Sequence, residues 1–158
     1  MRYLIDGYNL IFSLDEEESS LQESRELIIN KLKKLSTVLS ATFTVVFDAA
    51  HDDSEWNRSH TGDLEIIFTE RGETADECII DEVRRAKTPA AITVVTSDKG
   101  LSLEAKTLGA QTKKSCAFLS WSSRKFSTYQ PDEVEEKPPF KSSYEFDRWL
   151  YIFENKNH

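Results

Sequence analysis

The stretch MRYLIDGYNLIF, at positions 1–12, places a carboxylate directly behind a buried strand. Residues 2–5 are mainly apolar and predict a short strand inside a sheet. Asp6 ends this strand, and Gly7 is expected to let the chain turn toward Tyr8 and Asn9. The reason for a charged residue at this point depends on where the other carboxylates of the chain fall.

Length and composition predict one soluble domain. The chain has 158 residues, of which 39% are hydrophobic and 30% are charged. This length is sufficient for a sheet with helices packed on it. No apolar run approaches the roughly 20 residues that a membrane-spanning helix needs, and the N-terminus lacks the pattern of a signal peptide. We therefore expect a cytoplasmic protein with no membrane partner.

The charge and the cysteines narrow the possible functions. A formal net charge of -8 argues against binding nucleic acid by bulk electrostatics, although cations bound in an acidic pocket would reverse the local field. Cys78 and Cys116 lie far apart and lack the spacing of metal ligands. Free thiols are therefore expected rather than a disulfide or a zinc site.

Short apolar segments alternate with helical patterns along most of the chain. Segments rich in β-branched and aromatic residues predict strands at 2–5, 42–47, 64–68, 91–96 and 110–113. Apolar residues at helical spacing predict helices at 20–39, 74–87, 99–108 and 115–126. This alternation predicts an α/β fold with a mainly parallel central sheet covered on both faces. In such a fold, sites form beyond the carboxyl ends of the strands.

The composition changes after the domain predicted at 1–128. The tail at 129–158 begins with an acidic, proline-containing linker. It continues into a predicted helix with one apolar face, formed by Phe146, Trp149, Leu150 and Phe153. We expect this helix to dock on the domain, and docking on a partner or on a second copy is the alternative.

Acidic residues follow the predicted strands. Asp6 and Asp48 come directly after one of them, and Asp98 lies two residues after the strand at 91–96. Right-handed crossovers bring the ends of parallel strands to one edge. Glu73 and Asp76 lie near the first turn of the next helix, where either can point into the same crevice. Taken alone, Asp98 is better explained as a helix N-cap. For Glu73 or Asp76, favourable interaction with a helix N-terminus is an alternative explanation.

Taken together, the acids favour a metal site. Like charges in a partly buried crevice repel one another, so the cluster needs a cation or a proton. Hard oxygen ligands suit Mg²⁺ or Mn²⁺, and the scarcity of histidine and cysteine disfavours zinc. Such sites commonly act on phosphate esters. Asn9 is either an uncharged ligand or phosphate contact beside Asp6, or it closes the turn after Gly7 through its side chain. Thr96 and Ser97 either hold a metal-bound water or orient Asp98, or they cap a helix.

Five segments of the chain carry a resemblance to a known family: YLIDGYNLI, TVVFDA, IIFTERGETADECI, VVTSDKGL and LGA. In their order and spacing they resemble the YacP-like branch of the NYN domains, which are relatives of the PIN-domain nucleases. The likeness covers about residues 2–120. It implies a three-layer α/β/α PIN-like fold and metal-dependent endoribonuclease activity.

The resemblance also implies roles for single residues. The catalytic, metal-binding acids that match the family's motifs are Asp6, Asp76 and Asp98. Asn9 and Glu73 lie in the same motifs as supporting positions, with Glu73 a further candidate ligand. Asp48 in FDA also matches, and it either ligates metal through water or shapes the pocket.

An RNA substrate would need basic and aromatic contacts around a repulsive pocket. The basic candidates for RNA binding are Arg58, Arg71, Lys99, Lys113, Lys114, Arg124 and Lys125. Each of them alone is better explained as a solvated surface charge. Trp56 is a candidate for stacking on a base, whereas Trp121 is more typical of helix packing. His51 and His60 are predicted to be surface loop residues.

These features favour a divalent-metal endoribonuclease that cleaves RNA with metal-activated water. A non-catalytic RNA-binding or adaptor module with the same fold is the alternative, in keeping with the net charge and the apolar tail. A phosphate-accepting receiver domain is a third hypothesis, but that class pairs acids near the first strand and LIDGYN supplies only one. The expected partner is RNA, either naked or presented by a larger ribonucleoprotein, and the protein is expected to be a monomer or a weak homodimer.

Overall fold

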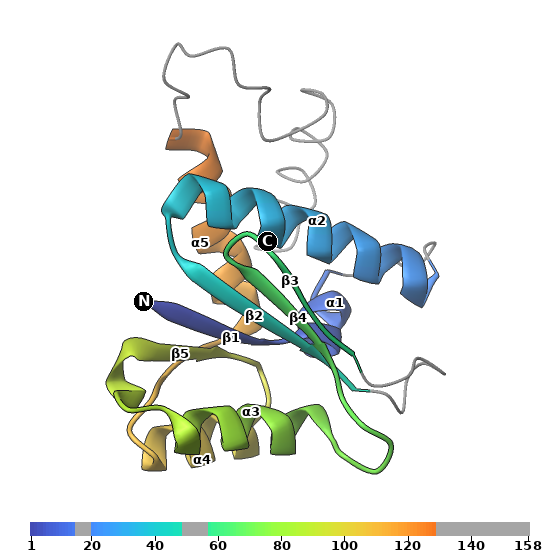
Figure 1. Ribbon diagram of the computed structural model, residues 1–158. Coiled ribbons are helices and arrows are strands. Elements are labelled where there is room, and N and C mark those ends of the chain that lie inside the picture. The colour runs from blue at the N-terminus through green and yellow to red at the C-terminus, as the bar shows by residue number, and fades with distance from the viewer. Residues whose placement is uncertain (15–19, 49–56, 129–158) are drawn as a thin grey trace.

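The computed structural model describes residues 1–14, 20–48 and 57–128, and in this part of the chain six strands form one sheet (Figure 1). The strands are β1 (Arg2–Asp6), β2 (Thr42–Phe47), β3 (Asn57–Thr61), β4 (Leu64–Phe68), β5 (Ile92–Val95) and β6 (Gln111–Lys113). Their order across the sheet is β3-β4-β2-β1-β5-β6. Every neighbouring pair is parallel except β3 with β4. The predicted mainly parallel sheet is confirmed.

Helices cover both faces of this sheet (Figure 1). They are α1 (Gly7–Phe12), α2 (Leu21–Leu39), α3 (Ala75–Arg85), α4 (Lys99–Thr107), α5 (Ser115–Thr128) and the short 3-10 helix η2 (Pro89–Ala91). Side chains of α1, α2 and α5 pack on one face, and side chains of α3 and α4 pack on the other. Successive strand residues point to opposite faces, so Leu4 and Ile5 enter different cores. The three-layer α/β/α prediction is also confirmed.

Local capping fixes where α2 and α3 begin. The hydroxyl of Ser20 accepts a hydrogen bond from the Glu23 N–H at 3.1 Å, which starts α2. Thr74 and Glu77 form a reciprocal capping box at the start of α3. Because β4 ends only a few residues earlier, this cap holds the first turn of α3 beside the carboxyl edge of the sheet.

Helix α1 differs from the sequence prediction, which expected a turn after Gly7. Gly7 is instead the first residue of α1. A Cβ atom at this position would lie 2.5 Å from Phe47 Cε1 and 3.0 Å from the Val46 carbonyl oxygen. Glycine is therefore required by the close approach of α1 to β2, and not by an unusual backbone angle.

Strand β3 was also missing from the prediction, because its sequence NRSHT is polar throughout. It is an edge strand that forms a hairpin with β4, in which Thr61 pairs with Leu64 across Gly62 and Asp63. Gly62 has a φ of +60°, as a tight hairpin turn requires. The prediction that His60 lies in a surface loop is wrong, since His60 belongs to β3 and is exposed there.

Several sequence predictions fall outside the described residues. These are the tail helix and its linker at 129–158, together with Trp56 and His51. Within the described ranges, no helix is long and apolar enough to cross a membrane. Cys78 is a buried thiol and Cys116 an exposed one, and both are free.

Candidate active site

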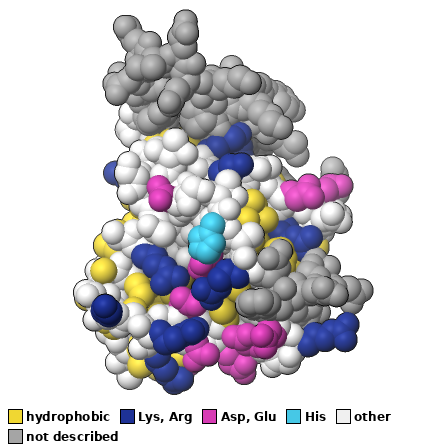
Figure 2. Space-filling model, viewed as in Figure 1, with side chains coloured by type: hydrophobic (Ala, Val, Ile, Leu, Met, Phe, Trp, Pro, Cys, Tyr) yellow, Lys and Arg dark blue, Asp and Glu magenta, His cyan; other side chains and the backbone are white. Residues whose placement is uncertain are grey.

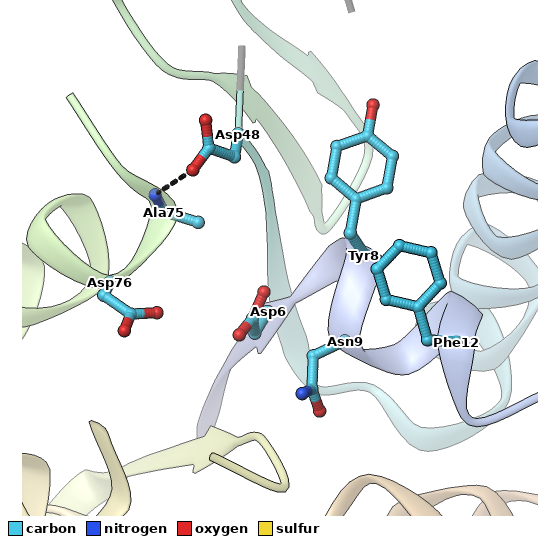
Figure 3. A pocket seen from close by; sticks show the side chains of 7 residues that line it. All are labelled: Asp6, Tyr8, Asn9, Phe12, Asp48, Ala75 and Asp76. Atoms are coloured by element: carbon cyan, nitrogen blue, oxygen red, sulfur yellow. Dashed lines mark hydrogen bonds between the residues drawn. The ribbon is translucent and has the colours of Figure 1, made fainter. Parts of the chain in front are cut away.

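A pocket of about 200 Å³ opens where β1 and β2 end and where α1 and α3 begin (Figure 3). Its lining consists of Asp6, Tyr8, Asn9, Phe12, Asp48, Ala75 and Asp76. Asp6 is the last residue of β1, Asp48 follows β2, and Asp76 lies in the first turn of α3. The structure therefore brings these three aspartates, which are distant in sequence, to one pocket at the carboxyl edge of the sheet.

Asp6 lies deepest among these acids, with 9% of its surface exposed. Burial raises the pKa of Asp6 to about 6, and the charge of Asp76 and, more weakly, that of Asp98 add to this shift. Hydrogen bonds from the Asn9 backbone N–H and the Thr96 hydroxyl lower the pKa in part. The hydroxyl of Thr96 lies 3.3 Å from Asp6 Oδ2. Asp6 is thus held in a setting where a proton or a cation stabilises it.

Asp76 shares this electrostatic environment. Partial burial raises the pKa of Asp76, and so do the charges of Asp98, Asp48 and Glu104. Asp98 thereby acts on both Asp6 and Asp76, although it does not line the pocket. Glu104, on α4, is a member of this acidic group that the sequence reasoning missed, because nothing in its helical context marks it.

Asp98 is the N-cap of α4, as its helix-capping explanation predicted. Asp98 Oδ1 accepts a hydrogen bond from the Leu101 N–H at 2.8 Å. The N–H of Asp98 itself donates to the Thr96 hydroxyl oxygen at 3.1 Å. Because Thr96 also donates to Asp6, this hydroxyl connects the two acids. Capping uses one carboxylate oxygen of Asp98 and is compatible with a second role for the other.

Asn9 has a structural role that neither sequence alternative included. Its Oδ1 accepts hydrogen bonds from the Ser97 N–H at 2.8 Å and from the Ser115 hydroxyl at 2.6 Å. The hydroxyl oxygen of Ser97 in turn accepts from the Ser115 N–H at 3.3 Å. Ser115 is fully buried, and nothing in the sequence marks it other than its place at the start of a helix.

Asp48 and Glu73 differ in their relation to the pocket. Asp48 Oδ2 accepts a hydrogen bond from the Ala75 N–H at 3.4 Å, so Asp48 holds the start of α3, which carries Asp76 (Figure 3). Glu73 is not among the residues that line the pocket. Its charge acts instead on Cys78, where burial and then Glu73 raise the pKa of the thiol to about 11.

The acids surround the pocket without converging on one point. Among the residues that the structure describes, no three His, Cys, Asp or Glu side chains form a group that could hold a metal ion. The donor set nevertheless consists of carboxylate oxygens, which Mg²⁺ and Mn²⁺ prefer. Among the described residues, no positively charged side chain offsets the raised pKa of Asp6 or of Asp76. The chemical type of these donors, though not their present spacing, suits a hard divalent cation.

The basic candidates lie in three different settings. Lys113 Nζ lies 4.4 Å from the centre of the Trp121 ring. Burial lowers the pKa of Lys113, and the charges of Arg124 and Lys125 add to this, so the three basic residues form one group around the end of β6 and α5. Trp121 also packs against the ring of Tyr3, as expected for a packing residue. Three further candidates, Arg71, Lys99 and Lys114, are exposed.

Arg58 belongs instead to an ion-pair network on the sheet face next to α3. It donates to Glu82 Oε1 at 2.8 Å, and Arg2 donates to Glu82 Oε2 at 3.0 Å. Glu65 lies 3.6 Å from Arg58 and 2.7 Å from His60. Basic and acidic side chains are accordingly interleaved on this face (Figure 2). The charge of Arg58 is largely satisfied within the protein.

The fold and the acidic pocket define a three-layer domain of the PIN-like type. The family model for the YacP-like NYN domain matches residues 3–148. The chain therefore belongs to the YacP-like NYN domain family, as its motifs indicated.

Individual relatives agree with this assignment. The chain is 34% identical over 101 residues to a protein of Bacillus subtilis (strain 168) described as "Uncharacterized protein YacP". That alignment spans 60% of this chain and 59% of the relative, which is less than two thirds of either. The crystal structure of Rae1 (YacP) from Bacillus subtilis is similar with a TM-score of 0.65 and 28% identity, covering 79% of this chain and 75% of that one. The crystal structure of a mutant of the same protein is similar with a TM-score of 0.64 and 26% identity. That match covers 93% of this chain and 97% of the mutant chain.

Proposed function

We propose that this chain is a divalent-metal-dependent endoribonuclease that hydrolyses RNA phosphodiester bonds. The observation that carries this proposal is the meeting of Asp6, Asp48 and Asp76 in one pocket of a YacP-like NYN domain, where burial and neighbouring acids raise the pKa of Asp6 and Asp76. A cation bound beside such carboxylates would stabilise their charged form. When bound, Mg²⁺ or Mn²⁺ would activate water and neutralise charge on the phosphate.

The residues of the pocket have distinct roles in this proposal. Asp6, Asp76 and Asp98 would hold the metal, and capping of α4 occupies only one carboxylate oxygen of Asp98. Thr96 orients Asp6 and the loop that carries Asp98. Asp48 positions the first turn of α3, and Asn9 fixes the loop after β5. Small movements of the acids would accompany metal binding, because no three of the described side chains yet form a metal-holding group.

RNA is the proposed partner, and basic residues would hold its backbone. Lys99 begins α4 beside Asp98, and Lys113 at the end of β6 interacts with the charges of Arg124 and Lys125 on α5. These positive charges offset the repulsion between RNA and the acidic pocket. Cleavage by the protein alone and cleavage of RNA presented by a larger ribonucleoprotein are both consistent with this arrangement.

A non-catalytic RNA-binding or adaptor module is the second candidate function. Two observations favour it: the net charge of -8 and the absence of a convergent metal-holding group in the described ranges. An adaptor would bind RNA without forming products when metal is added. Measuring binding and cleavage on the same RNA therefore separates the two functions.

The test is a cleavage assay on end-labelled single-stranded RNA, with Mg²⁺ or Mn²⁺ and with a chelator, in the presence and absence of a ribonucleoprotein fraction. We expect internal cuts that require the metal, and a loss of at least about a hundredfold in Asp6→Asn and Asp76→Asn. Asp81→Asn is the matched control, because Asp81 is an exposed acid on α3 outside the pocket. Cleavage that survives both pocket substitutions would reject the proposal.

A further inference from the structure

An exposed aromatic side chain lies at the acidic pocket. Phe12, the last residue of α1, lines the pocket and has 62% of its surface exposed. The other exposed large hydrophobic residues in the described ranges are Met1 and Leu103, and neither of them lines it. A single exposed hydrophobic residue is ordinary on a protein surface, so it is the location of Phe12 beside the aspartates that needs an explanation.

The ring of Phe12 is backed by a fixed aromatic group. Tyr8, one turn earlier in α1, is only 3% exposed, and the two rings are inclined by 25° with their centres 6.4 Å apart (Figure 3). Tyr8 packs by its edge against Phe47 at 5.2 Å, and its hydroxyl accepts a hydrogen bond from Arg25 at 3.4 Å. A ring on such a support loses little conformational freedom when a flat ligand packs on it.

We propose that Phe12 stacks on a base of the bound RNA, next to the phosphate that occupies the acidic pocket. This inference rests on the proposed function, and it adds a substrate-positioning residue on the side of α1. An uncharged ring suits this place, because a lysine or arginine here would pair with Asp6 or Asp48 and compete with the metal. Stacking accepts every base, since each has a π-face, so the contact would position the strand without selecting a sequence.

The first test compares substitutions of Phe12 in steady-state RNA cleavage. Phe12→Ala should raise KM about tenfold, and Phe12→Trp should restore it, whereas Phe12→Leu should not, because leucine fills space without a π-face. Leu103→Ala, at a comparably exposed residue on α4, should have a KM within about twofold of the wild-type value. A KM that is unchanged in Phe12→Ala, or that is restored by leucine, would overturn the inference.

The second test asks whether the partner of the ring is a base. We would measure cleavage of a series of RNAs that each contain one abasic nucleotide. At one position, beside the cut, the abasic nucleotide should raise the KM of the wild type about tenfold. At that position Phe12→Ala should not raise KM any further, because the substitution and the abasic nucleotide remove the same contact. If the effects of Phe12→Ala and of the abasic nucleotide on KM were independent at every position, base stacking would be contradicted. A contact of Phe12 with a protein partner would then be favoured instead.

Fluorescence separates failure of this inference from failure of the proposed function. RNA should quench the emission of Phe12→Trp saturably, and it should not quench that of Leu103→Trp, after subtraction of the wild-type signal. If the wild type cuts no RNA with any divalent metal, the nuclease proposal fails, and the quenching still decides whether Phe12 meets a base. Equal quenching in both variants, or none in either, would refute the stacking contact.

Discussion

The hydroxyl of Ser115 donates a hydrogen bond of 2.6 Å to Asn9 Oδ1 and so joins the first residue of α5 to the helix that follows β1. The same oxygen accepts the Ser97 N–H, at a sequence separation of 88 residues. Asn9 therefore ties together α1, the loop after β5 and α5 beside the acidic pocket. The side chain of Asn9 serves to hold Asp6 and Asp98 in a fixed relation.

This relationship predicts a stability effect at Ser115. Ser115→Ala should lower the free energy of unfolding by about 1–2 kcal/mol, since it removes a buried donor from Asn9. Ser127→Ala, an exposed hydroxyl on the same helix that also donates a hydrogen bond, should change it by less than about 0.5 kcal/mol. Urea unfolding of the two variants checks this, and equal midpoints would show that the Ser115 contact contributes little.

The raised pKa of Asp6 predicts a dependence of stability on pH when divalent metal is absent. The pKa rises from an ordinary value of 3.8 to about 6 on folding, so the folded protein binds the proton more tightly. The stability that this proton provides is complete below about pH 4 and is lost as the pH rises through about 6.

Asp6→Asn, which keeps this position neutral, should therefore be more stable than the wild type near neutral pH, by up to roughly 3 kcal/mol, and similar to it near pH 4. Thermal unfolding across this range, with Asp81→Asn as the control, measures the difference. A constant offset between wild type and Asp6→Asn at every pH would contradict the assignment of the shift to Asp6.

The close approach of Gly7 to Phe47 predicts a strong steric effect. Gly7→Ala should destabilise the protein by about 1–3 kcal/mol, because the new methyl group would overlap the Phe47 ring. Phe47→Leu removes that overlap at the expense of core packing. The double variant should therefore be more stable than the sum of the two single effects predicts. Denaturant unfolding of the single and double variants measures this. If the two changes in the free energy of unfolding simply add in the double variant, the proposed clash is excluded.

The ion pairs of Glu82 provide a further prediction. Burial favours the neutral form of Glu82, but hydrogen bonds from Arg58 and Arg2 outweigh it and lower the pKa. Glu82→Gln should cost about 1–2 kcal/mol at neutral pH. That difference should shrink as the pH falls through the lowered pKa of Glu82. Glu104→Gln, at an exposed pair with Arg84 at 3.7 Å, should cost under about 1 kcal/mol. Comparable losses in the two variants would refute the special role of Glu82.

The ends of β1 and β2 were predictable from the sequence because each is marked by a change from apolar to acidic residues. This change located Asp6 and Asp48, and parallel topology then implied that they meet. Strand β3 escaped prediction because an edge strand with polar side chains carries no apolar alternation. The roles of Ser115 and Gly7 depend on contacts with residues distant in the chain, Asn9 and Phe47, which no local pattern reveals.

The central claim is that Asp6, Asp76 and Asp98 share a hard divalent ion, and a crystal structure of the protein soaked in Mn²⁺ tests it most directly. Anomalous scattering should reveal manganese in the pocket, coordinated by Asp6 and by at least one of the other two aspartates, and the same soak of Asp6→Asn should show a much weaker peak. A map without manganese between these carboxylates, at a concentration that supports RNA cleavage, would contradict the account.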